Sequence, residues 1–209
     1  MLFADFTIVN LGTLSLNKYW HETERLRPPS ATCTLLNIAG IRLIVDPSPA
    51  PAPLETLLFA NTGLRPDAID LVFLTHHHAD HRFGLELFKG KRWLMAAPAL
   101  EEWKRADPAD EPLTSQVTAA EGNLPDGIDM FASPGHTLNH YSLAANTRAG
   151  RLIVAGDAVM TNDFFNNNDG FHNSADFALV KESIAHIRKI AGIIVPGHGN
   201  YFVNPAVCK

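Results

Sequence analysis

Four histidines and one aspartate fall within six consecutive positions at the end of the segment LVFLTHHHADH, residues Leu71–His81. The segment opens with four apolar residues, as expected of a strand that is buried on both faces. His76 and His78 are two positions apart, so their side chains leave an extended chain on the same side, whereas on a helix they would diverge by about 200°. Asp80 and His81 follow where the chain turns toward the next element. We therefore expect one short loop to direct four metal-ligand side chains into a single cavity.

Three further segments place a polar residue after an apolar run in the same way. MFASPGHT leads to His136, RLIVAGDA to Asp157 and GIIVPGHG to His198. A glycine directly precedes each of these residues, and glycine permits the unusual backbone that turns a side chain inward. Ligands collect at the carboxyl ends of the strands in open α/β sheets. We expect the four strand ends to converge on one crevice.

The four segments together are stronger evidence for a metal site than any one of them alone. Taken alone, His136 and His198 are typical of a satisfied core or loop histidine, and Asp157 is typical of a turn or helix cap. The His-x-His-x-Asp-His cluster differs, because buried polar groups need partners and a solvated loop has no need of that spacing. Five imidazoles and two carboxylates exceed the needs of one tetrahedral zinc, and the set lacks the thiolates of a closed structural site. We predict a two-metal site that shares Asp157, with the ligands His76, His78, Asp80, His81, His136, Asp157 and His198.

Composition indicates an ordinary globular chain, which we expect to form a single domain over residues 1–209. Apolar residues make up 46% and charged residues 19% of it. The net charge of −5 provides no basic patch for long nucleic acid, although a short nucleic acid is left open as a substrate. The apolar runs are too short to span a membrane, and Asp5 stands where a signal peptide carries positive charge, so we expect a cytoplasmic protein. Cys33 and Cys208 are expected to be reduced thiols.

The elements that must position these loops alternate between strands and helices. Strands are predicted at Leu2–Val9, Thr32–Ile38, Ile41–Val45, Leu71–Leu74, Trp93–Ala96, Asp129–Ala132, Tyr141–Ala145, Leu152–Ala155 and Ile193–Val195. Helices are predicted at Leu54–Ala60, Arg82–Phe88, Ala99–Arg105 and Ser174–Ile190. Ala39-Gly40 is expected to form a tight hairpin turn, and Asn173 to cap the last helix. The proline-rich stretch Asp46–Pro53 is predicted to be a surface loop rather than a linker, because the residues before it are too few for a domain.

The order of these residues resembles the signature of the metallo-β-lactamase superfamily, and the fit extends from about residue 5 to residue 203. The resemblance implies an α/β fold, a four-layer αββα sandwich with two mixed β-sheets. It also implies which residues hold each of two divalent metal ions. One ion would be bound by His76, His78 and His136, the other by Asp80, His81 and His198, with Asp157 between them. Zinc is the expected metal, with manganese and iron as alternatives, because all three accept histidine and carboxylate ligands.

Two more residues match family positions behind the metal ligands. Asp46 matches an aspartate that supports the site, where such carboxylates orient ligating histidines; the alternative is an ordinary turn before a proline. His140 lies four residues beyond His136, where many family members carry a second histidine after Gly-His-Thr-Pro-Gly. Leu138-Asn139 replace that Pro-Gly here. His140 is therefore predicted either to support the site or to be purely structural.

The resemblance implies a hydrolase whose nucleophile is a hydroxide bridging the two metals. Ions roughly 3.5–4 Å apart would acidify that water to a pKa of about 7, and Asp80 would orient it and take its proton. The leading hypothesis is hydrolysis of a small ester, thioester or lactone. A second is a phosphodiesterase or ribonuclease acting on short nucleic acid. A third is an oxidoreductase similar to persulfide dioxygenases, with one iron on His76, His136 and Asp157.

Specificity is expected to come from two loops rich in aromatic residues, Leu16–Pro29 and Asn162–His172. Aromatic side chains in such loops are typical of small-molecule pockets. The alternative is that they pack within their own loops or form a contact in an oligomer. The residues predicted to line the substrate pocket are Tyr19, Trp20, Phe164 and Phe165.

Overall fold

The first part of the chain forms a six-stranded mixed sheet in the order β1-β2-β3-β4-β5-β6. The computed structural model describes residues 2–207. The strands of this sheet are Ala4–Asn10 (β1), Cys33–Ile38 (β2), Ile41–Val45 (β3), Leu71–Leu74 (β4), Arg92–Met95 (β5) and Val117–Ala119 (β6). β1, β2 and β3 pair antiparallel, whereas β3 to β6 pair parallel. The predicted hairpin turn joins β2 to β3, and both of its residues, Ala39 and Gly40, have positive φ angles.

The second part forms a five-stranded mixed sheet in the order β11-β10-β9-β8-β7. Its strands are Ile128–Ala132 (β7), Tyr141–Thr147 (β8), Gly150–Gly156 (β9), Ile193–Pro196 (β10) and Phe202–Val203 (β11). β9 and β10 are parallel, and the other neighbouring strands are antiparallel. The parallel pair matters for the site, because both strands deliver their carboxyl ends to the same edge.

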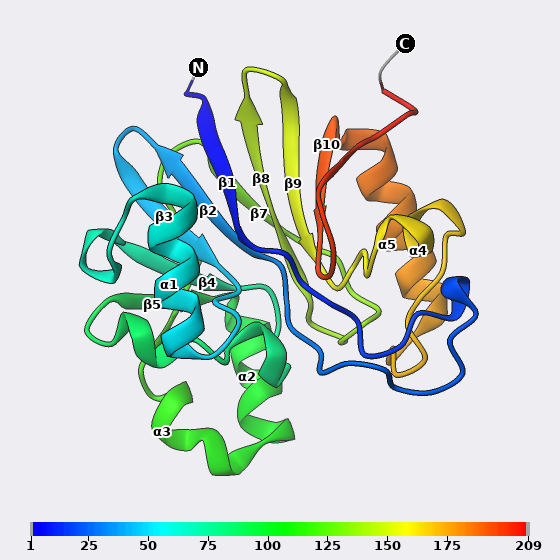
Figure 1. Cartoon of the computed structure of the whole chain (residues 1–209), viewed down its shortest axis with the longest axis horizontal. Helices are drawn as coiled ribbons and strands as arrows, with labels where there is room; N and C mark the ends of the chain where they lie inside the picture. Colours follow the sequence, from blue (N-terminus) through cyan, green and yellow to red (C-terminus); the bar gives the residue numbers. More distant parts are fainter. Residues whose placement is uncertain (1, 208–209) are drawn as a thin grey trace.

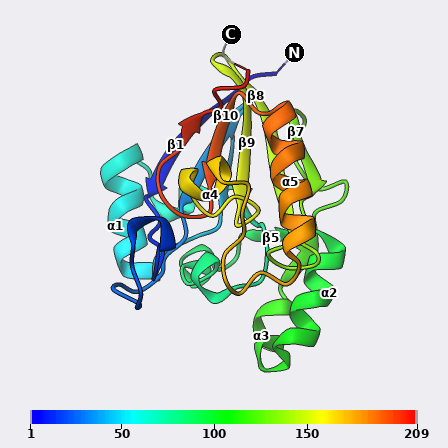
Figure 2. The same ribbon diagram turned by 90° about the vertical axis from the view of Figure 1, so that its right-hand side faces the viewer.

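Helices cover the outer face of each sheet (Figure 1). They are Pro51–Thr62 (α1), Ala97–Ala106 (α2), Glu111–Thr114 (α3), Asn162–Asn166 (α4) and Phe177–Ile190 (α5). α1, α2 and α3 lie on one side of the strands and α4 and α5 on the other, and the view in Figure 2 shows α5 running alongside β9. No helix within residues 2–207 combines the length and the apolar character needed to cross a membrane.

The strand sequences explain the four layers. In β4, Phe73 packs in the cluster between the two sheets, and Val72 and Leu74 pack in the cluster under α1 and α2. In β9, Val154 faces the other sheet and Ile153 faces α5. Side chains alternate across a strand, so continuous apolar runs supply a core on both faces. The predicted αββα sandwich with two mixed sheets is confirmed.

Three local predictions differ from the structure. The proline-rich stretch is not all loop, because α1 begins at Pro51 and Pro53 lies in its first turn, where the missing N–H has no helical partner to lose. The predicted helix Arg82–Phe88 is replaced by turns and a short 3-10 helix, Leu85–Phe88. α5 begins later than predicted, and its cap is Asp176, whose carboxylate accepts from two backbone amides, rather than Asn173.

The fold places the chemistry-bearing loops together at one edge. The chain termini lie at one end of the strands, and the turn after β10 points toward the other end (Figure 1). That turn, the segment after β4 and the residue after β9 follow the carboxyl ends of their strands. The loop between β7 and β8, which carries His136, lies at the same edge. Cys33 is buried within β2, and Cys208 lies outside the described residues.

Candidate metal centre

The histidine-rich segment after β4 is extended first and turns afterwards, as its spacing predicted. His78 has a β-region backbone, and a single 3-10 turn, Ala79–His81, follows it. The extended part sends His76 and His78 to one side, and the turn brings Asp80 and His81 toward the same space. One loop therefore supplies four of the seven predicted ligands.

The first group of candidate ligand atoms is made by three histidines and one aspartate. Nδ1 of His78 lies 3.0 Å from Nε2 of His76 and 2.8 Å from Nε2 of His136. Nε2 of His136 also lies 3.1 Å from Oδ2 of Asp157. Each of the four residues offers one ligand atom, and these atoms all lie within 4.8 Å of one another.

The second group is made by Asp80, His81 and His198, and meets the same limit of 4.8 Å. Nε2 of His198 lies 3.7 Å from Oδ2 of Asp80. The other carboxylate oxygen of Asp157, Oδ1, lies 3.1 Å from Nε2 of His81 and 3.4 Å from Nε2 of His198. The two oxygens of Asp157 therefore face different groups, which is the arrangement of a bridging ligand.

Hydrogen bonds behind the site fix which nitrogen of each ring faces it. Nδ1 of His198 donates to the carbonyl of Ser30 at 2.9 Å, so its Nε2 is left for the site. The hydroxyl of Thr75 donates to Asp46 at 2.8 Å and can therefore accept from Nδ1 of His76 at 3.1 Å. Nδ1 of His81 lies 2.8 Å from Asp46. Three imidazoles thus present Nε2 to the centre, and Asp46 orients two of them.

Burial sets the protonation of the first group. Burial lowers the pKa of His76 and His78, with neighbouring imidazoles adding to the shift for His76. Burial also lowers the pKa of His136 to about 4. Desolvation acts to raise the pKa of Asp157, but His81, His198 and His136 outweigh it and hold that pKa well below its usual range. Neutral imidazoles around an ionised carboxylate are the protonation states that metal binding requires.

His81 behaves differently, since it lies between two carboxylates. Burial acts to lower its pKa, but Asp157 and Asp46 together raise it well above the ordinary value. Its Nε2 is buried and makes no hydrogen bond in the described part of the chain, and the same is true of Oδ1 of Asp157. Two facing buried groups, neither with a hydrogen-bond partner, fit a cation bound between them. The donor set and the electrostatics of the first group therefore suit divalent metals, while the role of each residue as a ligand stays a prediction.

His140 lies directly behind the first group. Its ring centroid is 5.0 Å from that of His76. The hydroxyl of Ser142 donates to a backbone carbonyl, so it accepts from Ser133, which in turn accepts from Nδ1 of His140 at 2.9 Å. This chain of bonds keeps the ring in one orientation against His76. Both predicted roles, support of the site and a structural role, are compatible with this position.

A pocket of about 280 Å³ opens over the candidate ligands. Both predicted loops contribute to its wall, but through residues other than the four proposed from sequence. The wall residues from the first loop and its flanks are Leu14, Ser15, Arg25 and Pro29; those from the second are Met160, Phe171, His172 and Asn173. None of the four residues predicted to line the pocket is among them, because an aromatic-rich loop does not reveal which of its residues face inward.

The four aromatic residues predicted to line the substrate pocket are not among the residues that line this pocket. Phe165 is fully buried in the core beside α5, where the guanidinium of Arg188 lies 4.0 Å from its ring centroid. Phe164 packs beneath the pocket wall against Tyr19, whose hydroxyl donates to Asp169. These side chains stabilise the loops from below, because burying aromatic surface in a small loop cluster anchors the loop.

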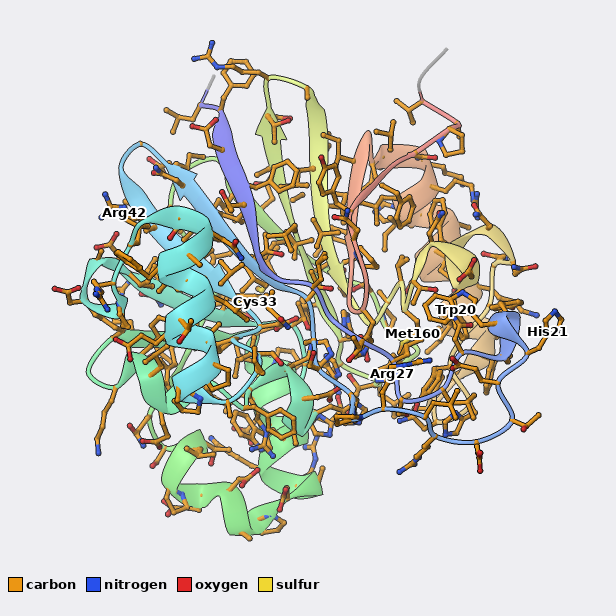
Figure 3. The ribbon with its side chains drawn as sticks, viewed as in Figure 1. Trp20, His21, Arg27, Cys33, Arg42 and Met160 are labelled. Carbon is orange, nitrogen blue, oxygen red and sulfur yellow. The ribbon has the colours of Figure 1, made fainter. Side chains whose placement is uncertain are left out.

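Trp20 lines a second cavity of about 380 Å³, whose lining also includes His198. It is 59% exposed, and its indole N–H donates to Asp163 of α4. Figure 3 shows Trp20, Arg27 and Met160 on the α4 side of the molecule, with His21 pointing outward. The Leu16–Pro29 loop is therefore fastened to the segment that follows Asp157.

Comparison with known proteins agrees with the fold. The family profile of the metallo-beta-lactamase superfamily matches residues 26–198. Metallo-beta-lactamase domain-containing protein 1 of Xenopus laevis is 30% identical over 145 residues, which are 68% of this chain and 59% of that protein. Hydroxyacylglutathione hydrolase of Citrobacter koseri is 37% identical over 108 residues, 51% of this chain and 39% of that enzyme. The chain thus spans about half the length of the curated relatives it matches.

Solved structures share the architecture. A protein of Thermotoga maritima described as a candidate metallo-beta-lactamase superposes with a TM-score of 0.69 at 21% identity, covering 96% of this chain and 99% of that one. An N-acyl homoserine lactone hydrolase, with the product N-hexanoyl-L-homoserine at its catalytic metal center, superposes with a TM-score of 0.68 at 21% identity, covering 93% and 92%. At this identity the similarity shows the fold.

Proposed function

The chain belongs to the metallo-β-lactamase superfamily, and we propose that it is a binuclear metallohydrolase that cleaves a small ester, thioester or lactone. The observation that carries the proposal is that two groups of ligand atoms share Asp157 at the floor of one pocket. Zinc is the proposed metal, because imidazole and carboxylate ligands without thiolates suit a zinc site that keeps positions for water and substrate.

Bound divalent cations supply Lewis acidity and acidify water at neutral pH. The chain's own residues hold and orient the reactants. Asp80 contributes one oxygen 3.7 Å from Nε2 of His198 and remains partly exposed to the pocket. Its other oxygen would accept a proton from the attacking water, which is the general-base role proposed for it. Leu14, Met160 and Phe171 form an apolar wall that limits access of bulk water.

The pocket lining favours an uncharged reactive group over a phosphodiester. Arg25 is the one lysine or arginine among the residues that line it, whereas sites for phosphate usually gather several cationic or amide donors. Its apolar wall suits the hydrocarbon part of an ester, thioester or lactone. The two relatives named for their substrates, a hydroxyacylglutathione hydrolase and an acyl homoserine lactone hydrolase, support the same class.

A hydrolase panel with metal analysis tests the proposal. Protein purified without added metal should contain close to two transition-metal ions per chain and should hydrolyse one member of a set of aryl esters, thioesters and lactones. Asp157→Ala should lose both metal and turnover. Activity confined to bis-p-nitrophenyl phosphate would select the phosphodiesterase instead. One iron per chain with oxygen consumption would select the oxygenase.

A further inference from the structure

The loop between β7 and β8 carries His136 and ends at His140, yet little apolar burial holds its tip. Leu138 is 56% exposed. The loop's carbonyls at Gly135 and His136 accept hydrogen bonds from the segment before α5. Those bonds fasten only the first half of the loop. The two backbone amides that follow Thr137 therefore need another partner, since unpaired backbone groups destabilise a loop.

Glu102 of α2 supplies that partner. Its Oε1 accepts from the amide of Leu138 at 3.2 Å, and its Oε2 accepts from the amide of Asn139 at 2.8 Å. Hydrogen bonds from backbone amides to a carboxylate are charge-assisted and stronger than neutral ones. A helix that covers the first sheet thus holds a loop of the second sheet.

The next residue of α2, Trp103, supports the loop that carries His76 and His78, and it does so through Arg82. Nε of Arg82 donates to the carbonyl of His77 at 2.9 Å, and its guanidinium lies 4.8 Å from the ring centroid of Trp103. Trp103 is fully buried and donates to Asp110, which also pairs with Arg82. Adjacent residues of α2 therefore contact the loops that carry His76, His78 and His136.

The departure of this chain from the family pattern accounts for the contact. A proline at position 138, as in Gly-His-Thr-Pro-Gly, has no N–H to donate. Leu138 has this N–H, and the carboxylate of Glu102 accepts from it and from the N–H of Asn139. The tip of the loop is tied here by a side chain of α2 rather than made rigid by a proline ring.

We propose that Glu102 is a positioning residue for the candidate metal centre, which fixes the loop of His136 and thereby sets the first group of ligands. The proposal rests on the proposed function, since it concerns the same site. Glu102 touches neither metal nor substrate; it acts through the backbone of Leu138 and Asn139. Loss of a side chain that bonds directly to a metal ligand typically lowers metal affinity 10- to 100-fold. Glu102 lies one step further from the metal, so we expect its loss to lower the affinity about tenfold.

Cobalt(II) binding to the metal-free protein tests this without relying on turnover. Glu102→Ala should bind one of the two cobalt ions about tenfold more weakly than wild type and give a changed visible absorption spectrum. Glu102→Gln should lie between them, because its amide retains one acceptor. Glu101→Ala is the matched control, since Glu101 is on the same helix, is exposed and pairs only with Lys104 among the described residues. It should behave as wild type.

The outcomes separate this proposal from the proposed function. If Glu102→Ala unfolds at a lower temperature but binds cobalt with wild-type affinity and spectrum, Glu102 is only structural and the proposal fails. If that variant does not fold, Glu102→Gln decides by the same titration, and wild-type binding by it would overturn the proposal. Failure of the wild-type protein to bind cobalt would instead refute the metal centre on which the proposed function depends.

Discussion

Asp46 accepts a hydrogen bond from Nδ1 of His81 across 2.8 Å, and the same oxygen accepts from the hydroxyl of Thr75, which holds His76. The other oxygen accepts from the backbone amide of Thr75 at 2.9 Å. Asp46 is buried and has a φ of 50°, an uncommon backbone for a residue other than glycine. One carboxylate therefore orients two candidate ligands that belong to different metal groups.

Asp46→Asn should weaken metal binding although no candidate ligand is changed. An asparagine side chain has one acceptor oxygen. Its NH₂ would therefore meet either both the N–H of His81 and the hydroxyl of Thr75, or the backbone N–H of Thr75. We expect a loss of about 10- to 100-fold in metal affinity, measured by competition with a chelator. Asp129→Asn is the control, because that carboxylate is 76% exposed and pairs with Arg151 instead. Equal metal retention in the two variants would contradict the role given to Asp46.

Gly197→Ala should disturb Asp157 by direct contact. A Cβ atom at position 197 would lie 1.8 Å from Oδ1 of Asp157, so the carboxylate would have to move away from His81 and His198. We expect loss of bound metal with little change in fold, measured as metal per chain beside the far-ultraviolet circular dichroism. Gly192→Ala is the matched control on the other side of β10, where the nearest atom to a new Cβ is 3.4 Å away. Normal metal content in Gly197→Ala would show that Asp157 is not held as the structure has it.

The sequence predicted the fold and the convergence of the seven candidate residues because both depend on local signals. Apolar runs such as Leu71–Leu74 give the strands, and a polar residue after a glycine marks where each strand ends. The pocket wall could not be predicted in the same way. Whether Phe165 or Phe171 faces the pocket depends on how the segment after Asp157 folds, and α4 within it has no strong sequence signal.

Contacts between distant segments were also beyond prediction. Glu102 looks like any helix-surface glutamate in the sequence, and only the packing of α2 against the loop after β7 gives it two backbone partners. The same holds for Ser30, whose carbonyl orients His198 from 168 residues away. Periodicity and motif spacing describe a residue's own element, whereas these roles depend on tertiary packing.

Phe171→Ala and Phe165→Ala should separate substrate binding from stability. Phe171 lines the pocket, so its truncation should raise KM for the ester or thioester identified in the panel with a smaller effect on kcat. Phe165 is fully buried, so its truncation should lower the free energy of unfolding by about 3–5 kcal/mol while leaving KM unchanged. Steady-state kinetics and urea denaturation measure the two effects. A raised KM in Phe165→Ala with unchanged stability would show that Phe165 contributes to substrate binding instead.

The contact between Tyr19 and Asp169 predicts a loss of stability in alkali. The hydroxyl of Tyr19 donates to Asp169 at 2.7 Å, and burial, followed by that hydrogen bond and the nearby carboxylate charge, raises the pKa of Tyr19 from 10.0 to about 12. As pH rises between these values, the unfolded chain gives up the proton before the folded chain does, so the contribution to stability is full below the lower value and declines toward the higher one. Between about pH 9 and about pH 11, the urea midpoint should therefore fall more for wild type than for Tyr19→Phe, which has no phenol to ionise at this position. The urea midpoint of Tyr201→Phe, which changes an exposed tyrosine, should fall as much as that of wild type. An identical decline in wild type and Tyr19→Phe would mean that the loop is not held through this phenol, and Trp20 with Asp163 would then be its main attachment to the segment after Asp157.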